Sequence, residues 1–175
     1  MKLTLRKPNL SDKEELIAYC NAFGETPNGI EGTSFLTSYE SIEEWLHFLE
    51  ILEREETAPD NLVPAHQYVL VDDNQRILGM INLRLKLNDY LAQYGGHVGY
   101  SILPNVRGLG FGSQQLALLL PIARQLGMEK LLITASETNG ASQKVIENNG
   151  GVFEQSVQFP EENDVLYRYW LTLEP

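Results

Sequence analysis

The segment from Gly95 to Gly112 carries an arginine, a histidine and several glycines in a spacing that could bind a phosphate group. It reads GGHVGYSILPNVRGLGFG, in which an alternating apolar stretch ends at Pro104 and a glycine-rich loop follows. The next residues, 113–125, have the composition of a helix. The unpaired N–H groups of a first helical turn and the helix dipole attract an anion, and glycine lets the backbone approach it closely. Arg107 adds a fixed positive charge. The sequence therefore predicts a phosphate-binding loop.

Two common nucleotide-binding patterns do not fit this loop. The P-loop pattern requires a Lys-Ser or Lys-Thr pair after its last glycine, whereas Gly112 is followed by Ser113 and Gln114. The dinucleotide pattern requires a further glycine three residues after Gly110, where this chain has Ser113. The remaining alternatives are another phosphate ligand and a tight turn between a strand and a helix that binds no ligand.

The loop resembles the pyrophosphate loop of the GNAT superfamily of N-acetyltransferases. The family pattern is Arg/Gln-x-x-Gly-x-Gly/Ala, and Arg107, Gly110 and Gly112 fit it. The preceding strand, which ends in Ile-Leu-Pro, is also similar to that of the family.

A second match lies downstream, after a short apolar run at 130–135. Asn139 and Ser142 occupy the positions where the family has an asparagine at the end of its fifth strand and a small residue three positions later. From His97 to Gly151 the chain resembles the bacterial branch of the superfamily that is described as predicted acetyltransferases.

The resemblance implies a GNAT-type α/β (α+β) fold. In that fold a mixed, mostly antiparallel sheet of about seven strands has helices on both faces. Its fourth and fifth strands splay apart, and the pantetheine arm of the cofactor enters the gap.

The resemblance also implies direct transfer of an acetyl group from acetyl-CoA, as cosubstrate, to a primary amine. The backbone near the end of the fourth strand would bind the thioester, the glycine-rich loop the pyrophosphate, and the polar turn after the fifth strand the cofactor arm. The predicted cofactor-binding residues are Ser101, Ile102, Leu103, Arg107, Gly108, Leu109, Gly110, Phe111, Gly112, Ser113, Asn139 and Ser142.

An alkylammonium has a pKa of about 10.4, so the acceptor must lose a proton before it attacks. His97 lies on the expected fourth strand, where many family members carry a catalytic Glu or His, and its ordinary pKa of about 6.5 suits a base. A histidine with a purely structural hydrogen bond is the alternative. Glu137, near the end of the fifth strand, is another candidate proton acceptor, and an exposed loop acid is the alternative there.

The usual proton donor of the family is absent from its usual place. Many relatives have a tyrosine seven residues after the asparagine, where this chain has Ile146. Tyr167 or Tyr169 on the last strand could substitute, although a packing role is the alternative for either. The absence of the usual acid also leaves open a non-catalytic acyl-CoA-binding or sensing module of the same fold.

The composition bounds the remaining possibilities. The chain has 175 residues, enough for a single domain spanning 1–175, and one cysteine, Cys20, which excludes an intrachain disulfide and suits a reducing, cytoplasmic compartment. We expect no signal peptide and no membrane span. The net charge of −11 argues against a nucleic-acid partner and requires local positive potential at any coenzyme A site. The histidines at 47, 66 and 97 are not at metal-ligand spacing, so no metal is expected.

The acceptor cannot be identified from the sequence, because the family recognises it through the first two helices and nearby loops, here about 21–57. A homodimer is compatible with the family.

These residues require a set of elements to position them. We expect a first strand at 2–7, helices at 12–23 and from Ser41, and a hairpin of strands at 67–71 and 76–87. Ser41 and Glu44 form a capping box at the start of the second helix. A fourth strand at 97–102, a strand at 130–135, a helix at 141–149 and a closing pair at 152–159 and 165–173 follow. Pro121 should kink the helix after Gly112 or end a first segment near Leu120.

Overall fold

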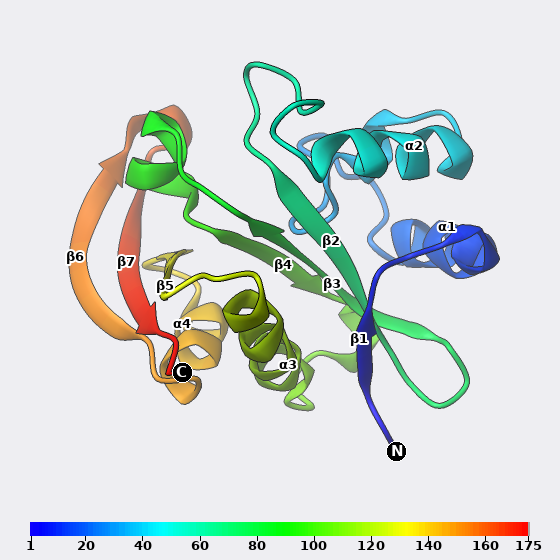
Figure 1. The fold of residues 1–175 in the computed structure, drawn as a ribbon. Helices are drawn as coiled ribbons and strands as arrows, with labels where there is room; N and C mark the ends of the chain where they lie inside the picture. Colours follow the sequence, from blue (N-terminus) through cyan, green and yellow to red (C-terminus); the bar gives the residue numbers. More distant parts are fainter. Residues whose placement is uncertain (175) are drawn as a thin grey trace.

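The order of strands and helices follows the order that the sequence predicts (Figure 1). The computed structural model describes residues 1–174. Within them the elements are β1 (Thr4–Arg6), α1 (Lys13–Ala22), α2 (Ile42–Leu52), β2 (Ala65–Val71), β3 (Ile77–Arg84), β4 (Val98–Ile102), α3 (Phe111–Gln125), β5 (Lys130–Ser136), α4 (Gly140–Asn148), β6 (Val152–Phe159) and β7 (Asp164–Thr172). Short 3-10 turns precede α1, α2 and α3 and join β6 to β7. One π-helical turn, Leu91–Gly95, lies before β4.

The strands form two antiparallel sheets. The first has the order β1-β2-β3-β4, and the second has the order β5-β7-β6. In the second sheet β7 pairs with both β5 and β6, so the last strand of the chain lies in the middle. The expected closing pair, and the expected mostly antiparallel arrangement of about seven strands, are confirmed.

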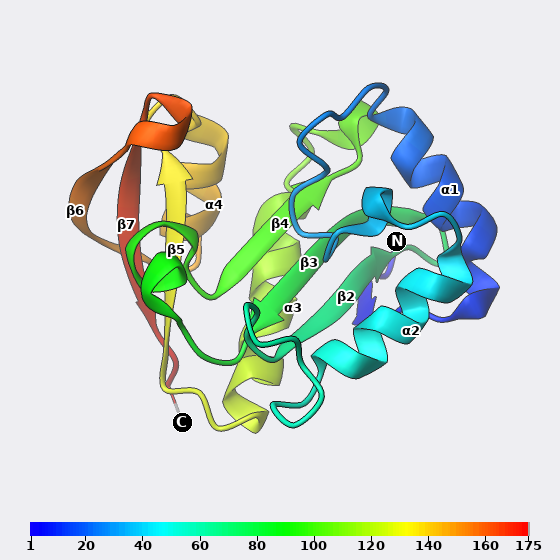
Figure 2. The same ribbon diagram turned by 90° about the horizontal axis from the view of Figure 1, so that it is seen from above.

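Helices cover both faces of the first sheet (Figures 1 and 2). On one face, α1 and α2 bury Leu16, Tyr19, Trp45 and Leu49 against Val69 and Met80. On the other face, α3 buries Leu116, Leu119 and Ala123, and this second core continues into the sheet of β5 and β7. Because side chains alternate along β2 and β3, these two strands contribute residues to the cores on both faces of the first sheet.

One half of the predicted capping box of α2 is present, because the Ser41 side chain accepts a hydrogen bond from the Glu44 N–H at 3.1 Å; within residues 1–174 no bond from the Ser41 N–H to the Glu44 side chain is found. Of the two outcomes predicted for Pro121, an end of the helix near Leu120 is wrong, since α3 continues through the proline to Gln125. Proline removes one backbone hydrogen bond, whereas Leu116, Leu119 and Ala123 are all fully buried around it. Burial of this apolar face outweighs the lost bond.

The two sheets meet at one point and then diverge, which confirms the expected splay between the fourth and fifth strands. His97, just before β4, donates its N–H to the Leu132 carbonyl of β5 at 2.7 Å. A Cβ on Gly96, where φ is +66°, would lie 2.5 Å from the same carbonyl oxygen, so only glycine fits this contact. Beyond it β4 and β5 run apart without a ladder between them (Figure 2).

Candidate functional site

The loop between β4 and α3 presents its backbone N–H groups in the way the sequence predicts. Gly108 and Gly110 both have positive φ, +80° and +86°, and Gly110 is the N-cap of α3 without a side chain that could cap the helix. Among residues 1–174, no acceptor is recorded for the N–H groups of Gly108 and Gly110. The first N–H groups of a helix also lack intrahelical partners, so the loop and the start of α3 together offer backbone donors of the kind that can hold an anion.

The third glycine of the loop is needed for packing, while its predicted contact with the cofactor stays a prediction. A Cβ on Gly112 would lie 2.9 Å from Cγ2 of Val145, so this glycine lets α3 pack closely against α4. Phe111 fixes the start of α3 by packing against Leu70 and Leu78. Asn148 donates a hydrogen bond to the Ser113 hydroxyl at 3.2 Å. These contacts hold the loop in place without occupying its N–H groups.

Arg107 lies beside the loop and is partly held by the protein. Its Nε donates to the Ile102 carbonyl at 3.3 Å, and its guanidinium lies 5.5 Å from the centre of the Phe23 ring of α1. Leu109, at the tip of the loop, is 65% exposed. The arginine thus brings a positive charge next to the glycine-rich loop of a chain whose net charge is −11.

β4 is the edge strand of its sheet, and its free edge faces the splay. The Arg84 N–H bonds to the His97 carbonyl, and the Leu103 N–H bonds to the Leu78 carbonyl. In an antiparallel pair the residues that bond to the neighbour alternate, so Tyr100 and Ile102 direct their N–H groups away from β3. Two backbone donors therefore face the gap between β4 and β5.

The Tyr100 side chain crosses this gap. Its hydroxyl lies 2.5 Å from the hydroxyl of Ser142 in the first turn of α4. Asn139, the N-cap of α4, accepts a hydrogen bond from the Ser142 N–H at 3.1 Å, and so fixes that turn. Burial raises the pKa of Tyr100, against the opposing effect of the bond with Ser142, so the phenol is protonated at neutral pH.

His97 is held in a backbone contact rather than directed into a pocket. It is 9% exposed, and its Nδ1 accepts a hydrogen bond from the Leu132 N–H at 2.9 Å. Burial, together with the positive charges of Arg84 and Lys130, lowers the pKa of His97 to about 4. In the neutral ring Nδ1 is the acceptor and Nε2 carries the proton, so no free lone pair remains. This geometry favours a structural role, and catalysis by His97 stays a prediction.

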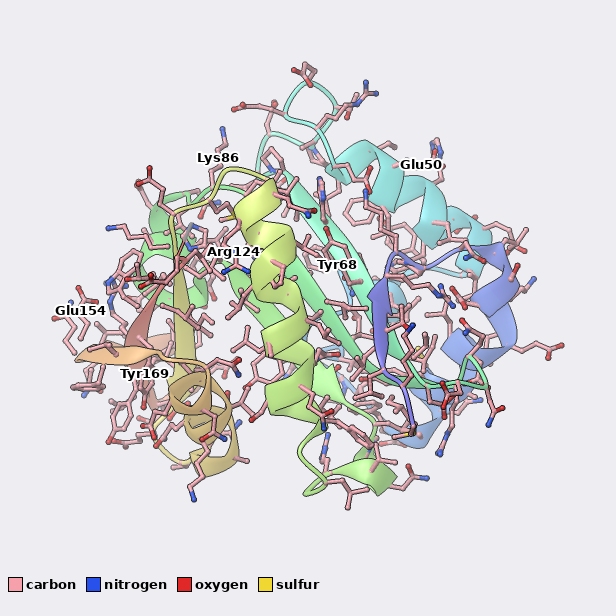
Figure 3. The ribbon with its side chains drawn as sticks, turned by 60° about the horizontal axis from the view of Figure 1, so that its bottom comes forward. Glu50, Tyr68, Lys86, Arg124, Glu154 and Tyr169 are labelled. Atoms are coloured by element: carbon pink, nitrogen blue, oxygen red, sulfur yellow. The ribbon has the colours of Figure 1, made fainter. Side chains whose placement is uncertain are left out.

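The other two predicted catalytic residues make contacts with β7 and α4. Tyr169 on β7 is 2% exposed and donates its hydroxyl hydrogen to Glu147 of α4 at 3.2 Å (Figure 3). Glu137 is exposed just after β5, and its backbone N–H bonds to the Val165 carbonyl. Their surroundings favour packing for Tyr169 and a loop position for Glu137, and their catalytic roles likewise stay predictions.

A pocket of about 850 Å³ is lined by the loop that follows α1, by Asn82 and Arg84 at the end of β3, and by the turn before β4. A Cβ on Gly99 would lie 3.0 Å from Asn82 Oδ1, 3.4 Å from Arg84 Nη2 and 3.6 Å from Glu31 Oε2. Three polar side chains therefore converge above a position that has no side chain.

The loop that forms one wall of the pocket lies directly on β4. A Cβ on Gly32, where φ is +77°, would lie 2.4 Å from the Tyr100 Cα. Gln67, which is buried, donates from Nε2 to the Gly32 carbonyl at 2.7 Å, and its Oε1 accepts from the Ser34 hydroxyl at 2.6 Å. These bonds fix the loop and hence the position of Glu31.

The sequence did not identify the side chains of Glu31, Asn82, Arg84 and Tyr100 as candidates. The alternation along β3 does place Asn82 and Arg84 on one face, but no pattern shows that a distant loop covers that face. Tyr100 lies in the strand whose backbone is expected to bind the thioester, but its side chain is not among the predicted residues. No group of three metal-ligating side chains occurs among residues 1–174, and no helix there is long and apolar enough to cross a membrane.

Comparison with known proteins adds a family and a set of similar folds. The sequence model described as the acetyltransferase (GNAT) domain matches residues 2–152. No curated protein matches the sequence significantly.

Solved structures resemble the fold along almost its whole length. An N-acetyltransferase from Staphylococcus aureus Mu50 is 18% identical, with a TM-score of 0.66 over 99% of this chain and 100% of that one. An acetyltransferase of the GNAT family from Streptococcus pneumoniae is 20% identical, with the same TM-score of 0.66 and coverage of 99% and 100%. Mutant forms of a spermidine/spermine N-acetyltransferase from Vibrio cholerae are 19% identical, with a TM-score of 0.65 over 98% and 95%. At these identities the structures support the fold alone.

Proposed function

Because the chain belongs to the GNAT acetyltransferase family, we propose that it transfers the acetyl group of acetyl-CoA directly to a primary amine. The observation that carries this proposal is the splay beside β4, which combines free backbone donors with an anion-binding loop at one end. The residues present fit the cosubstrate. The N–H groups around Gly108 and Gly110 suit a pyrophosphate, and Asn139 and Ser142 border the gap on its opposite side.

The free edge of β4 supports a role in stabilising the reaction's intermediate. When an amine attacks the thioester carbonyl, a C–N bond forms and the carbonyl oxygen becomes an oxyanion. The N–H groups of Tyr100 and Ile102 face the gap and could donate to that oxygen. Loss of one such donor typically costs about 10²-fold to 10³-fold in rate.

We assign the proton donor to Tyr100, in place of the tyrosine that Ile146 replaces. Collapse of the intermediate breaks the C–S bond and releases the CoA thiolate, which takes a proton. The protonated Tyr100 hydroxyl lies in the gap beside Ser142, one turn of α4 before Ile146. Ser142 is half-buried and can return a proton to Tyr100 from solvent.

The acceptor loses its proton to water in this scheme. The lone pair of His97 Nδ1, the predicted base, is already occupied by the Leu132 N–H. We therefore expect kcat/KM to rise with pH toward the pKa of the amine, without an inflection near the ordinary histidine value of about 6.5.

Thermal melting and thiol release test the proposal. Acetyl-CoA or CoA at about 100 times its Kd should stabilise the protein by about 2.7 kcal/mol, whereas ATP should not raise Tm. Thiol release from acetyl-CoA with a panel of amines then measures transfer. A shift with CoA but no release with any amine would support the non-catalytic binding module, which Ile146 still motivates. No shift with CoA would refute the cofactor assignment. Size-exclusion chromatography would test the homodimer, which stays a prediction.

A further inference from the structure

Arg84 differs from the other two partly buried arginines of the chain. Arg6 forms two hydrogen bonds with Asp12, at 2.8 and 2.9 Å, and Arg168 bonds to Glu154 at 2.8 Å. Among residues 1–174, no carboxylate lies within 4.0 Å of Arg84. A buried charge without a partner is unfavourable, and proteins normally pair such groups. The guanidinium of Arg84 therefore has no carboxylate in direct contact within the described residues.

Only one nitrogen of Arg84 is occupied. Nη1 donates to the carbonyls of Gly95 and Gly96, both at 3.0 Å, and so holds the turn before β4. Nε and Nη2 have no recorded acceptor within the described chain, and Nη2 faces the space above Gly99. These two N–H groups form one edge of the guanidinium, which matches the two oxygens of a carboxylate.

An opposite charge faces the same space. Glu31 Oε2 would lie 3.6 Å from a Cβ on Gly99, on the wall formed by the loop after α1. Burial lowers the pKa of Arg84, while Glu31 and Tyr90 raise it, but a guanidinium stays charged at neutral pH. The space above Gly99 therefore has a cationic side and an anionic side.

We propose that the acceptor is an amino acid whose carboxylate binds the free edge of Arg84 and whose amino group lies toward Glu31. This inference rests on the proposed acetyl transfer and names its substrate class. A polyamine lacks the carboxylate and would place a cation near Arg84, so it should be a poor acceptor. The volume of about 850 Å³ leaves room for a side chain, and Leu52, Leu62 and Val63 offer apolar walls for it.

The first test compares matched acceptors. Thiol release is measured with the standard L-amino acids, and the best of them is compared with its α-amide, with its decarboxylated amine and with spermidine. We expect kcat/KM for the amino acid to exceed that for each of the other three by at least about tenfold, which corresponds to about 1.4 kcal/mol. Equal or faster acetylation of the amide or the amine would overturn the inference while leaving acetyl transfer intact.

The second test uses variants. R84Q should remove the preference for the amino acid over its amide, and R84K should retain part of it. Because the readout is a ratio between two acceptors, general loosening of the turn before β4 would not change it. R124Q removes the same charge from the end of α3 (Figure 3), at a residue that does not line the pocket, and should keep the full ratio. An unchanged ratio in R84Q would refute the role of Arg84.

A binding measurement keeps the inference testable even if no acceptor is turned over. Calorimetry on the CoA-saturated protein should show tighter binding of the amino acid than of its amide, and R84Q should abolish the difference. Equal binding of both by the wild-type protein would reject the substrate class. Failure of CoA itself to bind would instead reject the proposed function.

Discussion

Replacing Gly32 by alanine tests the contact between β4 and the loop after α1, which forms one wall of the pocket. The new Cβ would lie 2.4 Å from the Tyr100 Cα, 2.8 Å from the Gly99 carbonyl oxygen and 2.8 Å from the Tyr100 nitrogen. All three are backbone atoms, so no side chain can rotate away to make room. The residue also has a φ of +77°, which costs a residue with a Cβ about 1 kcal/mol. Overpacking typically adds about 1–3 kcal/mol, so we expect a total loss of about 2–4 kcal/mol in the free energy of unfolding.

Gly24 provides a matched control in the same loop. Its φ is +69°, but no atom lies within 4 Å of the position that a Cβ would take. G24A should therefore lose only the conformational part, about 1 kcal/mol. Urea unfolding measures both variants, with the m-value checked for constancy. Equal destabilisation of G32A and G24A would show that the loop does not lie on β4 as described. G32A should also raise KM for the acceptor more than KM for acetyl-CoA. The glycine-rich loop before α3, which we propose binds acetyl-CoA, is a different segment from the loop that contains Gly32.

Further changes test the remaining contacts. Y100F should lower kcat by about 10²-fold while leaving the CoA-induced rise in Tm unchanged; an unaltered kcat would exclude Tyr100 as the proton donor. R107A should reduce the rise in Tm that CoA causes. An equal rise in the variant and in the wild-type protein would show that the charge of Arg107 is not needed for CoA binding. The pKa of His97 is lowered to about 4 in the folded protein, so the unfolded chain takes up the proton first as the pH falls. The free energy of unfolding of the wild-type protein should therefore decrease by up to about 3 kcal/mol between about pH 6.5 and about pH 4. H97Q should flatten that decline in a pH series of urea melts. Burial would raise the pKa of Asp12, but hydrogen bonds from Arg6 and a backbone N–H outweigh it and hold the pKa below its ordinary value. The stability this pair contributes is therefore present at neutral pH and lost as the pH falls below about 4, and R6A should cost about 3 kcal/mol at pH 7 in the same assay.

Local patterns in the sequence were sufficient to predict the elements and their order. The cap at Ser41, the alternation along β3 and the loop after Pro104 each depend on residues close together in the chain. Pro121 shows the limit of such reasoning, because tertiary packing of α3 decides whether one missing hydrogen bond ends the helix. The sequence suggests a break there, and only the buried neighbours show why none occurs.

The candidate site was less predictable because its contacts join distant parts of the chain. Tyr100 meets Ser142, which is 42 residues away, and His97 meets Leu132, which is 35 residues away. The expectation for His97 rested on its residue type and its place in the strand. Neither reveals that the ring nitrogen would accept a backbone hydrogen bond from another sheet. Likewise, the charge of Arg84 was visible in the sequence, whereas its missing partner was not.

The close seating of Gly32 on Tyr100 has an evolutionary consequence. The segment that we propose binds the acceptor lies against the residue whose backbone and hydroxyl we assign to the chemistry. A descendant of this protein could acquire a new substrate by altering residues 26–31, which line the pocket. It could not readily gain a side chain at position 32, because the same mutation that reshaped recognition would push the reacting strand out of place.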